Sequence, residues 1–187
     1  VMKFNEKSYS IINVQKMPNG QHLHTIDMKD ETLQINDSVE LVVFDEMRDN
    51  TAANHSATHL LHKALKEVLG SHVSQQGSQV SNESVRFDFN HIDSISDEEI
   101  LKIEEIVNNQ IEEGFDVNVI ETSINEAKEM GAEALFGEKY GDVVRVVNMD
   151  YSIELCGGTH VNNTSDIKTF AIKSIESKGS GVYRIEG

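Results

Sequence analysis

Two histidines placed four residues apart constrain this chain more than any other feature. They are His55 and His59, in the segment NHSATHLLHKAL (residues 54–65), which has strong helical character. On a helix, side chains with this spacing lie on one face, one turn apart. Two imidazoles held in this way can share one metal ion. They leave the other coordination positions to be filled from elsewhere in the chain.

A second pair with the same spacing occurs much later, as Cys156 and His160 in LCGGTH. Together the two pairs offer three imidazoles and one thiolate, a set that matches the tetrahedral preference of zinc. Each pair alone is a weak signal. Helical histidines are mostly surface or capping residues, and a free cysteine is mostly a small buried apolar side chain. Spacing alone therefore leaves a zinc site and incidental histidines both open.

The segment 46–69 is predicted to form one helix that ends at Gly70. Its apolar residues recur at helical spacing and predict a face turned to the core, made by Leu61, Ala64, Leu65 and Val68. At about 100° per residue, His62 falls on the same stripe as His55 and His59. His62 is therefore a further candidate, either as a substitute ligand or as a hydrogen-bonding partner of a ligand.

Two glycines, Gly157 and Gly158, stand between Cys156 and His160. We expect them to form a tight turn that brings both side chains to one point, because glycine adopts backbone conformations closed to other residues. The free N–H groups of such a turn can also hold an oxyanion or a phosphate. A simple connecting turn remains the alternative.

The remaining pattern predicts an α+β fold, with mixed or antiparallel sheets and helices packed on them. Strands are expected at residues 9–15, 22–28, 39–44, 73–80, 84–89, 116–121, 143–149, 151–155, 167–175 and 182–185, with a turn-rich segment at 135–140 and a loop at 176–181. Capping boxes predict two further helices, which begin at Ser96 with Glu99 and at Ser123 with Glu126. Gly114 is expected to end the first of these.

Two domains are expected. Residues 1–45 hold too few strands for a stable sheet alone, so we interpret them as part of a small barrel or as a sheet edge that leans on the next unit. Residues 46–187 contain both ligand pairs and form the main domain. The chain does not begin with methionine, which suggests an excised piece of a longer protein.

Charge and cysteine content limit the classes of partner. The formal net charge of −16 counts against a protein that grips nucleic acid over a wide basic surface. A single cysteine excludes an internal disulfide and suits a reducing compartment. No signal peptide is visible, and no apolar run approaches the roughly 20 residues of a membrane span. We therefore expect a cytoplasmic protein with no membrane partner and no disulfide-linked partner.

Six short motifs resemble, in order and in spacing, the editing domain of alanyl-tRNA synthetases: NHSATHLLHKAL, GSHVSQQGS, RFDF, ALFGEKY, ELCGGTHV and GVYRIE. The resemblance extends from about residue 39 to the end, and residues 13–44 are similar to the last part of the small β-barrel that precedes this domain. Free-standing AlaX-type editing proteins share the core. The related domain of threonyl-tRNA synthetases looks less similar, because it usually carries a proline where this chain has Thr159.

The resemblance implies an ester hydrolase that removes serine or glycine from mischarged alanine tRNA, tRNA(Ala). It implies zinc as the cofactor, with four ligands: His55, His59, Cys156 and His160. Thr58 and Gln75 match family positions suited to recognise the serine hydroxyl and are the candidate catalytic residues. Candidate contacts to the substrate or tRNA are Gly157, Gly158 and Arg184.

Alternatives of other classes stay open. The chain carries no motif for ATP binding or aminoacylation, so we expect editing without charging of tRNA, by a monomer. A free-standing AlaX-type deacylase would share this activity. A zinc-stabilised module that binds tRNA without catalysis is a second class, which the acidic net charge disfavours. A metal-free α+β interaction domain is a third.

Overall fold

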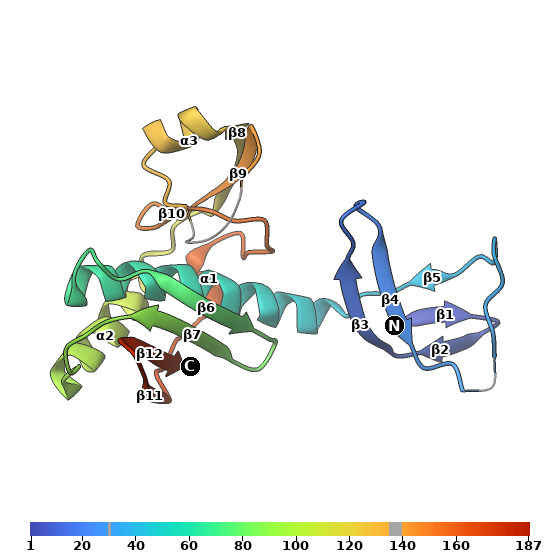
Figure 1. Ribbon diagram of the computed structural model, residues 1–187, viewed down its shortest axis with the longest axis horizontal. Helices are drawn as coiled ribbons and strands as arrows, with labels where there is room; N and C mark the ends of the chain where they lie inside the picture. Colours follow the sequence, from blue (N-terminus) through green and yellow to red (C-terminus); the bar gives the residue numbers. More distant parts are fainter. Residues whose placement is uncertain (30, 135–139) are drawn as a thin grey trace. The chain divides into compact units, whose positions relative to one another are not determined.

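The computed structural model describes residues 1–29, 31–134 and 140–187. The chain divides into two compact units, Val1–Asp45 and Glu46–Gly187. Figure 1 shows helices together with antiparallel sheets, so the predicted α+β class is confirmed. The described strands of the first unit do not close into a barrel.

The first unit consists of short strands: β1 (Met2–Phe4), β2 (Lys7–Tyr9), β3 (Ile11–Lys16), β4 (His22–Ile26) and β5 (Glu40–Leu41). They form a sheet in the order β2-β1-β5 and a separate β3-β4 hairpin. The strand predicted over 39–44 is reduced to two residues, because it pairs with the short strand β1, where Leu41 lies opposite Met2. The hairpin leaves apolar side chains exposed, among them Ile12 at 66% and Leu23 at 52%.

The second unit contains both ligand pairs. Its elements are α1 (Asp45–Leu69), β6 (Gln75–Val80), β7 (Val85–Asn90), α2 (Asp97–Glu113), β8 (Asn118–Ser123), α3 (Ile124–Glu129), β9 (Val143–Asn148), β10 (Ile153–Leu155), the 3-10 turn η1 (Thr164–Ile167), β11 (Ser174–Gly179) and β12 (Val182–Glu186). Two antiparallel sheets run in the orders β11-β12-β7-β6 and β10-β9-β8.

Helix α1 lies at the centre of the main hydrophobic core. Three of its leucines, Leu60, Leu61 and Leu65, are fully buried and pack with residues from β7, β12 and α2, including Phe87, Phe89, Ile185, Ile103 and Val107. Burying each leucine contributes about 1.5–3 kcal/mol. The predicted core face of this helix is confirmed: Leu61, Ala64 and Leu65 are fully buried, and the half-buried Val68 packs against the same core. The packing fixes the helix, and with it the direction of every other side chain it carries.

Helix ends follow local signals, and the predicted ones are confirmed. The Ser96 side chain accepts a hydrogen bond from the Glu99 N–H, and Glu99 reciprocates, so α2 begins at a complete capping box. Gly114 ends α2 in the left-handed conformation, with φ 70 and ψ 50. A second capping box at Ser123 opens α3. These predictions hold because capping involves residues within one turn of each other.

The strand predicted over 167–175 is wrong. Both backbone groups of Phe170 bond to one side chain: its N–H donates to Asn108 Oδ1 (2.9 Å), and Asn108 Nδ2 donates to its carbonyl (2.8 Å). The N–H of Ile172 donates to Glu104 Oε2 (2.7 Å). Side chains of α2 therefore satisfy the backbone groups that a strand would give to a neighbouring strand.

Other predicted strands are present with shifted ends. The segment 116–121 becomes strand β8 two residues later, and most of the loop predicted over 176–181 belongs to β11. Of the turn predicted over 135–140, residues 135–139 lie outside the described part of the chain. No helix in the described ranges combines the length and apolarity needed to cross a membrane.

One exposed lysine after η1 has a strained backbone. Lys168 has φ 73 and ψ −63, and the Thr169 N–H donates to the Ile167 carbonyl across it at 3.0 Å. This is a γ-turn of the rare form with positive φ, which a side chain with a Cβ adopts at a cost of about 1–3 kcal/mol. Glycine carries no such penalty.

We therefore predict that Lys168→Gly stabilises the protein. Relief of strain exceeds the larger backbone entropy that glycine gains in the unfolded chain, for a net gain of about 1 kcal/mol. Urea unfolding should show a raised midpoint with an unchanged slope. Lys168→Ala is the control, since alanine removes the charge but keeps the Cβ, and it should not raise the midpoint. A stabilisation by alanine equal to that by glycine would assign the effect to charge instead.

Candidate metal centre

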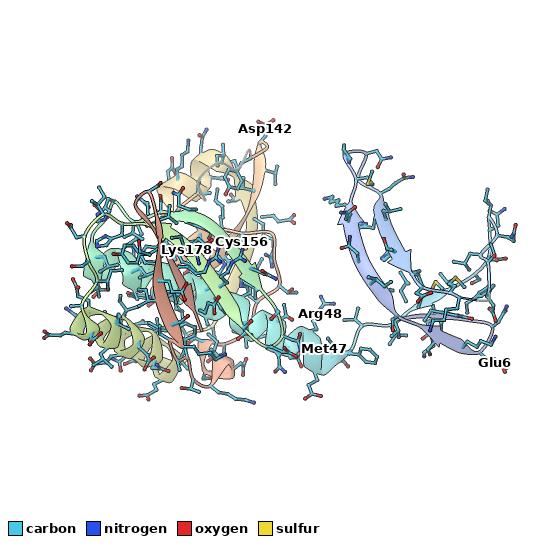
Figure 2. All side chains as sticks on the ribbon, turned by 60° about the horizontal axis from the view of Figure 1, so that its bottom comes forward. Glu6, Met47, Arg48, Asp142, Cys156 and Lys178 are labelled. Carbon is cyan, nitrogen blue, oxygen red and sulfur yellow. The ribbon has the colours of Figure 1, made fainter. Side chains whose placement is uncertain are left out.

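The two ligand pairs meet in the second unit. One ligand atom from each of four side chains lies within 4.8 Å of the other three: these side chains are His55, His59, Cys156 and His160. Figure 2 places Cys156 in the middle of this unit, whereas Asp142 lies at its edge. Tetrahedral zinc, with bonds of about 2.0–2.3 Å, holds its ligand atoms about 3.3–3.8 Å apart. The cluster needs only a small contraction to fit such an ion.

Each imidazole is held at one nitrogen. The Nδ1 atoms lie near three protein oxygens: Thr159 O for His55 (3.2 Å), Glu154 Oε2 for His59 (2.5 Å) and Ser56 Oγ for His160 (3.4 Å). Among the described residues, the buried Nε2 atoms of His59 and His160 have no hydrogen-bond partner. A buried polar atom without a partner needs an explanation. Around a bound metal, each imidazole is usually fixed by a hydrogen bond at one nitrogen and leaves the other free for the ion. The residues of this cluster therefore fit a metal ion.

Gly158 makes room for the imidazole of His55, one of the four candidate ligands. A Cβ built on Gly158 would lie 2.1 Å from His55 Cε1, whereas one on Gly157 would meet nothing within 4 Å. Neither glycine has positive φ. The predicted reason for the pair, a turn that requires glycine conformation, is therefore wrong. The structure requires glycine at position 158 because the backbone approaches the imidazole closely.

An arginine that the sequence motifs did not single out supports the same loop. Arg145 Nη1 donates to the carbonyls of Cys156 and Gly158, at 2.7 Å each. From the helix side, Ser56 Oγ accepts from the Val161 N–H at 3.1 Å. The loop that carries the second ligand pair is thus held by a side chain of β9 and by one of α1.

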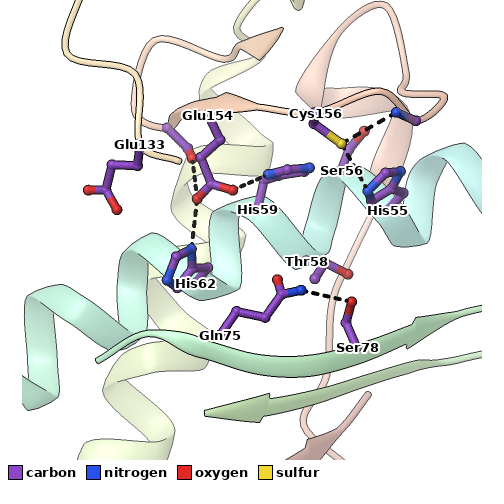
Figure 3. Close-up of polar contacts among 12 residues, drawn as sticks. His55, Ser56, Thr58, His59, His62, Gln75, Ser78, Glu133, Glu154 and Cys156 are labelled. Atoms are coloured by element: carbon purple, nitrogen blue, oxygen red, sulfur yellow. Dashed lines mark hydrogen bonds and ion pairs between the residues drawn. The ribbon is translucent and has the colours of Figure 1, made fainter. Parts of the chain in front are cut away.

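A buried carboxylate lies between two histidines of α1. Glu154 is 4% exposed, and its Oε1 lies 2.8 Å from His62 Nδ1 while its Oε2 lies 2.5 Å from His59 Nδ1 (Figure 3). His62 is outside the group of four candidate ligands. Glu154 thus joins His62 to His59, one of the four candidate ligands. The sequence motifs offered no reason to select Glu154 over its neighbours.

The electrostatics of the cluster favour charged side chains. Burial alone would raise the pKa of Glu154, but the hydrogen bonds from His59 and His62 outweigh it and lower the pKa to about 2. Burial would also raise the pKa of Cys156, yet the surrounding imidazoles lower it to about 3. Burial would lower the pKa of His59, but Cys156 and Glu154 raise it to about 10. The cysteine is thus held as a thiolate, the form that binds metal.

The two candidate catalytic residues lie on facing elements. Thr58 is 5% exposed, and its hydroxyl donates to the Asn54 carbonyl at 2.8 Å. The Gln75 amide, at the start of β6, donates to Ser78 Oγ at 3.2 Å. Figure 3 shows the Gln75 side chain directed from β6 towards α1, which carries Thr58 and the histidine ligands.

Arg184, a candidate contact to tRNA, forms an internal ion pair. Its Nε and Nη2 donate to the two carboxylate oxygens of Asp88, at 2.7 and 2.8 Å. Its neighbour Ile185 is fully buried in the core. Adjacent strand residues point to opposite faces, so Arg184 lies on the face of the sheet that is turned away from α1.

The centre borders a cleft. His160 lines a cavity of ≈ 330 Å³, together with Asp49 and Asn50 from the start of α1 and Lys168 after η1. Most of the lining residues are polar, and the apolar ones are Ala52, Ala53 and Val161. One of the four candidate ligands, His160, is therefore reachable from outside the core.

Comparison with known proteins gives two results. Residues 144–186 match the family described as "Threonyl and Alanyl tRNA synthetase second additional domain". The chain is also similar to alanine--tRNA ligases: 57% identical to that of Halalkalibacterium halodurans over 177 residues, 53% to that of Bacillus anthracis and 56% to that of Listeria welshimeri, each over 175 residues.

The match covers nearly all of this chain and a small part of its relatives. It extends over 93–94% of the chain, and the chain spans about one fifth (20%) of the length of the curated relatives it matches. The family resemblance inferred from the motifs is thereby confirmed. The chain is the counterpart of a region of alanine--tRNA ligase that contains the second additional domain of threonyl- and alanyl-tRNA synthetases.

Proposed function

We propose that residues 46–187 form a zinc-dependent editing domain that hydrolyses Ser-tRNA(Ala) or Gly-tRNA(Ala) to free amino acid and tRNA, in the cytoplasm. Residues 1–45 would be the C-terminal part of a small β-barrel that precedes it. One observation carries the proposal. A cluster of three histidines and one cysteine occurs in a chain that matches alanine--tRNA ligases at 53–57% identity.

Editing is needed because an amino-acid binding pocket cannot separate alanine from glycine and serine well enough. A pocket for alanine cannot strongly exclude glycine, which is smaller, and one added hydroxyl is penalised by only a few kcal/mol. A second site that hydrolyses the wrong ester restores accuracy. To spare Ala-tRNA, this second site needs polar groups that are satisfied by the serine hydroxyl and left unpaired by the alanine methyl group.

In this proposal Thr58 and Gln75 supply those groups. The Thr58 hydroxyl donates its hydrogen to Asn54, which leaves its oxygen free to accept one from a serine hydroxyl. The Gln75 amide bonds to a single exposed serine and retains both donor and acceptor capacity. When bound, zinc would supply a Lewis acid that polarises the ester or a water molecule.

A second candidate function follows from the number of ligands. Four protein ligands are typical of structural zinc sites, whereas catalytic sites usually keep one position open. The cluster therefore also suits a zinc-stabilised module that holds tRNA without hydrolysing it. The net charge of −16 weakens this reading, because a binding module depends on attraction to phosphate. Deacylation of Ser-tRNA(Ala) separates the two.

The first prediction of this proposal concerns the metal. Protein purified without added metal should contain about one zinc per chain by elemental analysis. Cys156→Ala should lose most of it, because the substitution removes the thiolate of the cluster. Gly158→Ala should also weaken retention, since its Cβ would displace His55.

Gly157→Ala is the matched control for the metal prediction, because the space beside Gly157 is empty, and this variant should retain zinc. Absence of zinc from the wild type, with no rise in melting temperature when zinc is added, would refute the metal site.

The second prediction concerns specificity. The wild-type chain should deacylate Ser-tRNA(Ala) and largely spare Ala-tRNA(Ala), with a high KM because its net charge attracts tRNA little. Gln75→Ala removes a polar partner of the serine hydroxyl. It should slow Ser-tRNA hydrolysis about 10- to 100-fold, a loss of about 1–3 kcal/mol, with little effect on the rate for Ala-tRNA.

Gln79→Ala is the control for specificity, since Gln79 lies on the same strand, is exposed and pairs across to Arg86. Its ratio of rates for the two substrates should equal that of the wild type. If Gln75→Ala lowers both rates by the same factor and also lowers the melting temperature, the role of Gln75 is structural.

A further inference from the structure

The carboxylate of Glu154 stands between His59, a candidate metal ligand, and His62, which lies outside the candidate cluster. We propose that Glu154 is a positioning residue, which fixes the tautomer and the direction of His59, and that His62 holds Glu154 in place. The inference rests on the proposed zinc site. It adds Glu154 and His62, which would influence metal binding by orienting His59 and would not contact the ion themselves.

The contacts determine which nitrogen of each ring is free. Glu154 presents one oxygen to His59 Nδ1 at 2.5 Å and the other to His62 Nδ1 at 2.8 Å. An ionised carboxylate can only accept, so the hydrogen of each ring lies on Nδ1. In the neutral ring, which is the form that binds metal, Nε2 of His59 then carries no hydrogen, and it is one of the buried atoms without a hydrogen-bond partner in the described part of the molecule. That atom is suited to bind a metal.

Burial makes the arrangement rigid. Glu154 is 4% exposed, and His59 and His62 are each 5% exposed. If the buried carboxylate rotated, it would lose its hydrogen bonds to the two imidazoles, and water could not replace them. His62 satisfies the oxygen that His59 leaves free, and its ring packs against Phe87, with ring centroids 5.5 Å apart. Loss of His62 would leave Oε1 of Glu154 with only the long hydrogen bond that Ser152 Oγ donates to it, at 3.5 Å.

The strand that carries Glu154 also carries a ligand. Glu154 pairs with Val147 in the β10-β9 ladder, and Cys156 follows two residues later. The same ladder thus sets both the position of the thiolate and the position of the carboxylate that orients His59. His59 and His62 are three residues apart on α1 and so share a helix face.

Zinc affinity and a cobalt spectrum test the proposal on the whole chain. The zinc dissociation constant is measured by competition with a chelator, and the absorption of the Co²⁺-substituted protein reports ligand geometry. Glu154→Ala should weaken zinc binding about 10- to 100-fold and shift the Co²⁺ bands. Glu154→Gln keeps an acceptor for His59 and should recover most of this loss. His62→Leu leaves the ligand set intact and should still weaken binding, about 10-fold.

Glu104→Ala is the control, because Glu104 accepts a backbone hydrogen bond far from the cluster, from Ile172. It should lower stability and leave zinc affinity unchanged. Wild-type affinity and an unchanged Co²⁺ spectrum in Glu154→Ala would overturn the positioning role while leaving the zinc site intact. If Glu154→Ala does not fold, unchanged zinc affinity together with an unchanged Co²⁺ spectrum in His62→Leu would overturn the proposal instead. A wild type that binds no zinc would overturn both proposals.

Discussion

The contact between strand β10 and helix α1 is the constraint on which the centre depends. The helix is fixed by its buried leucines, so its histidines emerge in set directions. The strand has three residues and is held by its pairing with β9. A slip of one residue in this ladder would turn Glu154 to the opposite face and move Cys156 away from His55. A short ladder and a well-packed helix together determine whether four separate side chains form one site.

Contacts between residues that are close in the sequence could be predicted, whereas contacts between distant residues could be predicted only in part. The capping boxes and the glycine that ends α2 involve neighbouring residues, so the helix ends agree with expectation. The ligand group was predictable because each pair has a helical or turn spacing of its own. Glu154 and Arg145 were missed because their roles depend on partners that no periodicity connects to them. Glu154 meets His62 across 92 positions of the chain.

The strand misassigned over 167–175 illustrates the same limit. Its residues have strand-like composition, but Asn108 and Glu104 of α2 take its backbone hydrogen bonds. Composition describes which conformations a segment tolerates. It does not reveal that a polar side chain from another helix supplies the partners that a neighbouring strand would otherwise supply.

Several cations of the second unit are used internally. Arg145 donates to the backbone of the ligand loop, Arg184 to Asp88 and Lys66 to Glu133. These contacts stabilise the scaffold and leave fewer positive groups to meet a phosphate chain. A contact between Arg184 and tRNA would have to compete with a bidentate carboxylate, which is among the strongest partners an arginine can have.

The distance along the chain between the ligand pairs has a consequence for biosynthesis. His55 and Cys156 are 101 positions apart, and closing a flexible loop of that length costs about 4 kcal/mol of chain entropy. At ribosomal speeds, the first pair is synthesised about 5–20 s before the second. During that interval the nascent chain displays a two-histidine chelate that cannot complete its coordination. Firm capture of an ion by all four side chains would therefore follow docking of the loop that carries the second pair, and a loaded centre would mark a finished domain.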